Sequence, residues 1–185
     1  MSAPAEHYTA FTRLLHWLMA AMILAMLFIG VGMVASISSA HEVLIAVHRP
    51  LGIAILLLVL IRLANRLAHR APPLPSDLPL WQRLMAKASQ VLLYALMLAM
   101  PLIGWSMLSA GNYPIVMFGA VHLPAIAPAS PALYAFLRQA HTYLAFVLFA
   151  VFLLHLAGAL FHGLIRRDGV LASMVHGPGR KEDKH

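Results

Sequence analysis

The sequence predicts an all-α fold, an integral membrane bundle of four transmembrane helices that forms a single domain over residues 1–185. Of the 185 residues, 62% are hydrophobic and only 10% are charged, whereas a soluble domain carries about 25% charged residues. The mean hydropathy is +0.83. The hydrophobic residues gather into four runs, each close to the roughly 20 residues that a helix needs to cross a bilayer. This composition excludes an ordinary soluble domain.

The four predicted spans cover about residues 14–35, 43–65, 90–109 and 137–165. Each must satisfy its backbone hydrogen bonds internally, because the lipid core contains no water, and a helix is the structure that does so within one segment. Two prolines fall inside these runs. Pro101 is expected to kink the third helix, while Pro50 either kinks the second helix or marks the first turn of a helix that begins there.

Basic residues indicate the orientation of the spans. Eleven of the thirteen Lys and Arg residues fall on one side of the predicted topology, which the positive-inside rule makes cytoplasmic. They are Arg13, Arg62, Arg66, Arg70, Arg83, Lys87, Arg166, Arg167, Arg180, Lys181 and Lys184. Both termini are therefore expected in the cytoplasm. The basic residues that give the formal charge of +7 are thus interpreted as determinants of membrane orientation and not as a nucleic-acid-binding surface. In the inner connection, PPLPSDLP precedes a short amphipathic stretch, 81–87, that is expected at the membrane interface.

Five of the eleven histidines fall within the predicted spans, namely His16, His48, His141, His155 and His162. An ionisable residue inside a span is costly and is therefore a functional candidate. For one histidine, an interhelical hydrogen bond is an equally good explanation, but for five it is a poor one. His141 and His155 are fourteen residues apart, which places them on nearly the same helix face about 21 Å apart. The topology then pairs His48 with His141 near the outside and His16 with His155 near the cytoplasm.

Two imidazole pairs at two depths favour two haems. Neutral imidazole is a good axial ligand of haem iron, and two axial imidazoles leave no position for oxygen, which favours electron transfer. The chain contains no cysteine, so covalent attachment through C-x-x-C-H is excluded and the predicted cofactors are two non-covalent haems b. The main rival is a metal-ion transporter. Such a site usually needs carboxylates as well, and none of the six acidic residues falls inside a predicted span.

Three further residues are candidates for substrate contacts. His162 follows His155 by seven residues and has no histidine partner left. It is a candidate for binding a quinone or a haem propionate, and an interfacial structural role fits equally well. Arg49 and Arg138 are the basic residues assigned to the outer side, next to His48 and His141. They would make a positive field over the outer haem, which suits its propionates or an anionic donor.

Several stretches resemble the bacterial cytochrome b561 family of four-helix di-haem proteins, and the resemblance covers nearly the whole chain. They are LLHWLMA, VHRPLGIAILLLVLIRLANRL, PPLPS, MPLIGWSM and AHTYLAFVLFAVFLLHLAGALFHGLIRRDGVLASM. The resemblance implies a multi-pass b-type cytochrome of the bacterial inner membrane with haem ligands at His16, His48, His141 and His155. Members with an assigned activity resemble superoxide oxidases, which pass electrons from superoxide to ubiquinone. That activity would use Arg49 and Arg138 for the anionic donor, and His162 matches a position near the quinone site.

The leading hypothesis is a di-haem cytochrome that transfers electrons between a small outer, periplasmic donor, superoxide being one candidate, and the membrane quinone pool. If it is an enzyme, it is an oxidoreductase of the superoxide:ubiquinone type. The alternative is a haem-bearing anchor subunit for a dehydrogenase or hydrogenase, which would require a redox partner protein. A non-redox membrane protein whose histidines bind metal is a third hypothesis. The lipid bilayer is a partner in all three, and the sequence leaves a homo-oligomer open.

Overall fold

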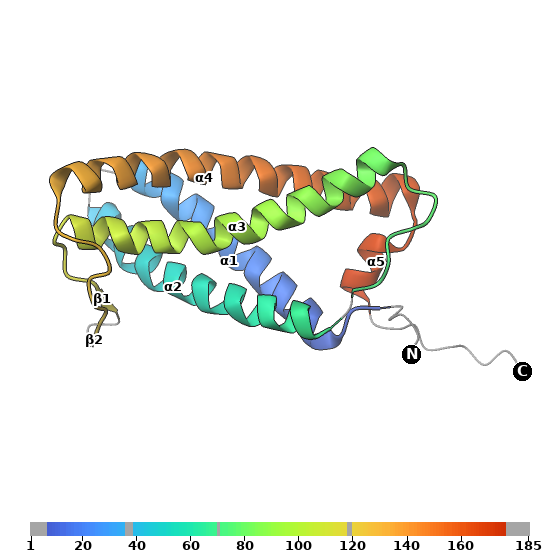
Figure 1. Cartoon of the computed structure of the whole chain (residues 1–185), viewed down its shortest axis with the longest axis horizontal. Helices are drawn as coiled ribbons and strands as arrows, with labels where there is room; N and C mark the ends of the chain where they lie inside the picture. Colours follow the sequence, from blue (N-terminus) through green and yellow to red (C-terminus); the bar gives the residue numbers. More distant parts are fainter. Residues whose placement is uncertain (1–6, 36–38, 70, 118–119, 177–185) are drawn as a thin grey trace, which may run out of the picture.

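The structure is a computed structural model that describes residues 7–35, 39–69, 71–117 and 120–176. Four long helices form a bundle in which successive helices run antiparallel (Figure 1). They are α1 (Ala10–Ala35), α2 (Ser39–Ala68), α3 (Leu80–Ala110) and α4 (Pro131–Leu160), which the π-helical turn η1 (Phe161–Arg166) continues. Each is long and apolar enough to cross a membrane. The predicted all-α membrane fold is confirmed.

Two helices extend well beyond the apolar runs that they contain. α2 begins at Ser39, so Pro50 lies in its interior and is not the first turn of a helix. α3 begins at Leu80, and the amphipathic stretch 81–87 forms its first turns rather than a separate interfacial segment. Pro101 lies inside α3 as well. Both prolines are tolerated inside membrane helices because neighbouring helices and local adjustments satisfy the carbonyl groups that they leave free.

The core lies in the middle of the bundle. α1 packs on α2, α3 packs on α4, and α2 also contacts α3. One buried cluster joins α1, α2 and α3, and consists of Met19, Ile23, Ile55, Leu56, Val59 and Met97. A second cluster joins α3 and α4 through Leu96, Leu148 and Val151. On α4 these residues lie between His141 and His155, so apolar packing separates the two histidine levels.

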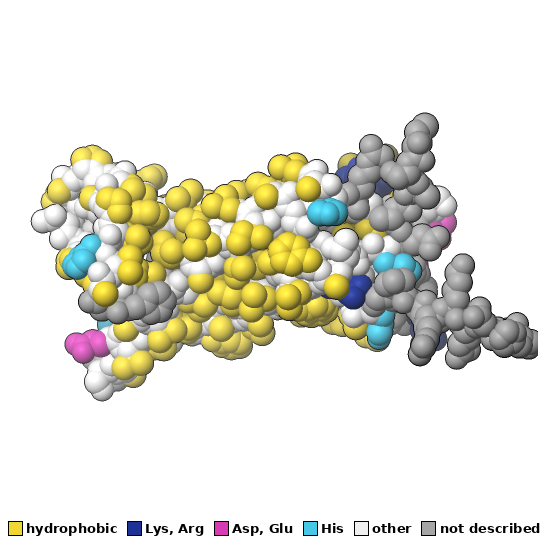
Figure 2. Space-filling model, turned by 90° about the horizontal axis from the view of Figure 1, so that it is seen from below, with side chains coloured by type: hydrophobic (Ala, Val, Ile, Leu, Met, Phe, Trp, Pro, Cys, Tyr) yellow, Lys and Arg dark blue, Asp and Glu magenta, His cyan; other side chains and the backbone are white. Residues whose placement is uncertain are grey.

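The outside of the bundle is apolar over its middle part. In Figure 2 a hydrophobic band covers this part, while charged side chains gather toward the two ends. Large side chains point outward, including Phe28 and Phe146, which are 70% and 66% exposed. In water such a surface would be an aggregation liability, whereas in a bilayer it contacts lipid tails.

A small hairpin at one end of the bundle was not predicted. Strands β1 (Val116–Met117) and β2 (Val121–His122) pair antiparallel within the connection between α3 and α4. The connection is held against the end of α3 because Trp105 Nε1 donates to the Pro124 carbonyl at 2.9 Å and the Ile126 N–H donates to Ser109 Oγ at 3.1 Å. These bonds satisfy backbone groups that would otherwise be unpaired at the membrane surface.

The opposite end is covered by a short helix, α5 (Val170–Val175), that lies beside η1. Trp17 Nε1 of α1 donates to the Met174 carbonyl at 3.0 Å, which ties α5 to the start of the bundle. Gly163 allows Leu171 to approach the π-helical turn, because a Cβ at this position would collide with the Leu171 side chain. The start of α1, the α2–α3 connection and α5 thus share one end of the molecule (Figure 1).

Candidate functional site

The first histidine pair joins α1 to α4. The ring centroids of His16 and His155 are 6.3 Å apart, and their planes are inclined by 70°. Both side chains are partly buried. Within the described residues α1 and α4 do not pack closely against each other, so this imidazole pair bridges two helices whose backbones stay apart.

The second pair joins α2 to α4 at the other level of the bundle. The ring centroids of His48 and His141 are 6.2 Å apart, with planes inclined by 65°. Here too the described parts of the two helices make few backbone contacts. The histidines that lie together are those that the topology pairs in the sequence analysis, and their binding of haem iron stays a prediction.

The separation within each pair fits a metal ion held between two rings. With a metal–nitrogen bond of about 2 Å on each side, two axial imidazoles have ring centroids about 6.3 Å apart. A porphyrin already supplies four nitrogen ligands, so a haem iron needs only two from the protein. In the part of the chain that the structure describes, no three side chains of the metal-binding types gather in one place. The chain thus offers histidines in pairs, and two is the number of protein ligands that a haem iron requires.

The inner pair lies beside Arg62, a residue whose charge predicts topology but which was not among the candidate site residues. Arg62 Nη2 is 3.2 Å from His16 Nδ1, and Arg62 Nε donates to the Tyr94 hydroxyl at 3.1 Å. Arg62 Nη1 also donates to the Thr12 carbonyl at 3.4 Å. Arg62 therefore connects α1, α2 and α3 beside the candidate ligand of α1. Its position inside an apolar run was an available signal, because a charged residue in a span is rarely accidental.

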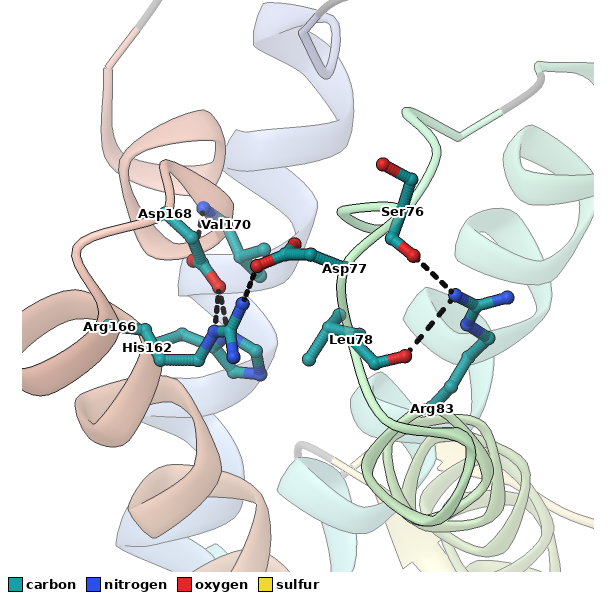
Figure 3. Close-up of polar contacts among 8 residues, drawn as sticks. All are labelled: Ser76, Asp77, Leu78, Arg83, His162, Arg166, Asp168 and Val170. Carbon is teal, nitrogen blue, oxygen red and sulfur yellow. Dashed lines mark hydrogen bonds and ion pairs between the residues drawn. The ribbon is translucent and has the colours of Figure 1, made fainter.

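His162 lies in η1 and has an acidic partner in the structure (Figure 3). Its Nδ1 donates to Asp168 Oδ2 at 2.6 Å, and Arg166 Nε donates to the same oxygen at 3.0 Å. Arg166 Nη2 also donates to Asp77 Oδ2 at 2.6 Å, which ties η1 to the α2–α3 connection. His162 and Asp168 are only 12% and 10% exposed. Because Nδ1 bonds Asp168, the orientation of the ring is fixed, and Nε2 is the nitrogen that remains for a ligand.

Asp168 reaches back to His162 because the chain reverses immediately after η1. Arg167 and Gly169, on either side of Asp168, both have left-handed backbone conformations, with φ of 52° and 82°. Burial raises the pKa of the Asp168 carboxyl, but hydrogen bonds from His162, from the Val170 N–H and from Arg166 outweigh it and leave the pKa below its ordinary value. The carboxylate is therefore ionised at neutral pH and accepts these bonds. A left-handed arginine gives no recognisable sequence signal, so sequence analysis could not find this contact.

The two outer arginines lie near the second histidine pair in different ways. Arg49 is partly buried, and its charge interacts electrostatically with the adjacent His48. Arg138 is exposed on α4, one turn before His141, and the Thr142 hydroxyl donates to its carbonyl at 3.0 Å. The structure therefore places one positive charge beside the outer pair and a second on the surface near it.

Comparison with known proteins decides the family. A family model described as prokaryotic cytochrome b561 matches residues 7–177. The chain belongs to this family. It is therefore a membrane-embedded b-type cytochrome of a kind found in bacteria, and membership implies that it binds haem b and carries electrons.

Three relatives resemble this cytochrome at moderate identity. Cytochrome b561 homolog 2 of Escherichia coli (strain K12) is 30% identical over 173 residues, which is 92% of each chain. Cytochrome b561 homolog 1 of the same strain is 27% identical over 144 residues, 78% of this cytochrome and 80% of the relative. The probable superoxide oxidase CybB of Yersinia pestis is 31% identical over 130 residues, 70% of this cytochrome and 73% of the relative.

Proposed function

We propose that this cytochrome binds two haems b and transfers electrons between a donor on the outer side of the bacterial inner membrane and the membrane quinone pool. The observation that carries the proposal is the presence of two imidazole pairs, each with the spacing of an axial ligand pair, at two levels of one bundle. His48 and His141 hold the outer haem, and His16 and His155 hold the inner one. When bound, haem iron supplies one-electron chemistry that no side chain of this protein can.

The orientation follows from the basic residues. Arg13, Arg62, Arg66, Arg166 and Arg167 all belong to the end that carries α5, which is therefore the cytoplasmic end. The β1–β2 hairpin then faces outward. The start of α1 and α5 lie on the cytoplasmic side. The predicted spans correspond to the apolar middle parts of α1 to α4.

His162 is our candidate for the quinone contact at the cytoplasmic end. Reduction of a quinone to a quinol takes two electrons and two protons, so the site needs a group that hydrogen-bonds the carbonyl oxygen and supplies a proton. Asp168 holds Nδ1 of His162 at 2.6 Å. The ring is thus fixed, and in the imidazolium form its Nε2–H can donate to the quinone carbonyl.

The haem content of the purified protein tests this function. We expect two haems b per chain in a pyridine haemochromogen assay of the detergent-purified protein, and a dithionite-reduced minus air-oxidised spectrum with two components. A single haem would contradict a relay between two levels. A colourless protein, after expression with adequate haem, would contradict the whole proposal.

The relative from Yersinia favours one particular donor, superoxide. Two superoxide anions would each give one electron and leave as oxygen, and one quinone would take both electrons and two protons to become quinol. Arg49 and Arg138 provide the positive field that attracts such an anion. The same residues suit haem propionates, and the two roles are compatible.

Charge reversal at the outer end tests the superoxide donor. In the Arg138→Glu variant we expect superoxide to reduce the haems at least tenfold more slowly at low salt, because the attraction is replaced by repulsion. Added salt should shrink the difference, since it screens exposed charges. The measurement is stopped-flow absorbance at several ionic strengths, with Arg167→Glu at the opposite end as the control. Equal rates in all three proteins at every ionic strength would rule out electrostatic capture.

A further inference from the structure

Arg62 is a positive charge that three elements of the bundle hold in one place. It belongs to α2, and its guanidinium contacts His16 at 3.2 Å and the Thr12 carbonyl at 3.4 Å on α1, and the Tyr94 hydroxyl at 3.1 Å on α3. Neighbouring polar contacts stiffen the same region, because Asn65 Nδ2 donates to Thr12 Oγ1 at 2.8 Å. A side chain that donates from Nε and Nη1 to two neighbouring helices loses most of its freedom to turn toward water.

No described carboxylate balances this charge. Asp77 and Asp168 both pair with Arg166 at the cytoplasmic end. Glu42 lies in the first turn of α2, twenty residues before Arg62 and about 30 Å away along the helix axis. The described neighbours of Arg62 are an imidazole, a phenol hydroxyl and a backbone carbonyl, all of which are neutral groups. Among the described residues its charge is therefore not neutralised, and it lies in contact with His16 of the inner pair.

Each histidine level has an arginine beside it, and at the inner level the arginine is in direct contact with an imidazole. The charge of Arg62 interacts with both imidazoles of the inner pair, through direct contact with His16 and electrostatically with His155. At the outer level, the charge of Arg49 interacts with His48. A cation close to a redox centre favours the reduced state, because one-electron reduction lowers the charge of the centre by one.

We propose that Arg62 is a positioning residue that raises the reduction potential of the inner haem, by fixing a positive charge beside the His16–His155 pair. The proposal rests on the proposed function, in which this pair binds haem. At a separation of about 10 Å and an effective dielectric constant of about 20, one fixed charge changes a one-electron equilibrium by roughly tenfold.

The test is a spectroelectrochemical redox titration of the full-length purified protein. We compare the wild type with Arg62→Gln and Arg62→Met, which remove the charge at similar length, and with Arg62→Lys, which retains it. Arg66→Gln is the matched control, because Arg66 lies one turn further along α2 and is exposed. The haem content of each variant is measured in the same samples.

In the neutral variants we expect the equilibrium constant for reduction of one haem to fall by about tenfold. This corresponds to a reduction potential lower by about 59 mV for one electron. The potential of the other haem should stay unchanged. Arg62→Lys should keep most of the wild-type value, and Arg66→Gln should keep all of it. Unchanged potentials in the neutral variants, or an equal shift in Arg66→Gln, would overturn the proposal.

Haem loss is also informative. Loss of one haem from both neutral variants, with retention in Arg62→Lys, would support a role for the charge. Loss from all three variants at position 62 would overturn it, since the shape of the arginine would then be what matters. A wild-type protein without two haems would contradict the proposed function itself, before any variant is compared.

Discussion

Replacing His155 with alanine is expected to reduce the haem b content from two per chain to one. His155 lies opposite His16 with a ring separation of 6.3 Å, and a haem that loses one of two axial imidazoles in a non-covalent site loses much of its binding free energy. The remaining haem should have the spectrum and potential of the outer site, because His48 and His141 are untouched. The pyridine haemochromogen assay and a redox titration measure both quantities.

Three further variants make this prediction specific. His141→Ala should lose the other haem, so that the two single-haem proteins differ in potential. The double variant His16→Ala/His155→Ala should lose no more haem than His155→Ala alone, because both residues serve one site. His122→Ala is the control, since His122 is exposed in β2 and belongs to neither pair. Two haems in His155→Ala, or a loss in His122→Ala, would show that the assignment of ligands is wrong.

Replacing His162 with alanine is expected to slow electron transfer to a short-chain ubiquinone by about a hundredfold, which is the usual worth of a positioned proton donor. The haem content should stay at two, because His162 belongs to neither ligand pair. Asp168→Asn should slow the same step by about tenfold, since a neutral amide orients the imidazole less well than the carboxylate that now lies 2.6 Å from it. The measurement is stopped-flow reoxidation of the reduced protein by the quinone.

Two controls separate quinone chemistry from general damage. Ferricyanide accepts an electron without a proton, so its rate should be the same in His162→Ala and in the wild type. His176→Ala removes an exposed histidine from the same end of the molecule and should leave both rates unchanged. If quinone oxidised His162→Ala at the wild-type rate, the quinone would have to bind elsewhere. If ferricyanide slowed equally, the substitution would have disturbed the protein as a whole.

The architecture could be predicted because the bilayer leaves few options. A run of apolar residues such as 14–35 must form a helix in lipid, since no other single segment satisfies its own backbone. The helical period then relates His141 to His155 without any knowledge of tertiary contacts. Helix ends were harder to predict. The first turns of α3, for example, lie outside the apolar band, where hydropathy no longer indicates whether the chain is helical.

The polar networks at the inner end could not be predicted in the same way. Arg62 contacts His16 and Tyr94 across three helices, and only the packing of α1, α2 and α3 brings these atoms within hydrogen-bonding distance. The contact of Asp168 with His162 depends on a left-handed conformation at Arg167, which a non-glycine residue adopts only when surrounding contacts compensate for it. Neither contact follows from a repeating pattern of residues in the sequence.

The sequence by itself determined the number of membrane helices, the preferred side of the basic residues and the two depths at which histidines occur. Each of these depends on a property of single segments: hydropathy, charge or helical repeat. Only the tertiary structure decided which imidazoles face each other at 6.2 and 6.3 Å, that an arginine lies beside the inner pair, and that a carboxylate holds His162. Those contacts join side chains from separate helices, and their distances depend on how the helices pack, which local sequence does not encode.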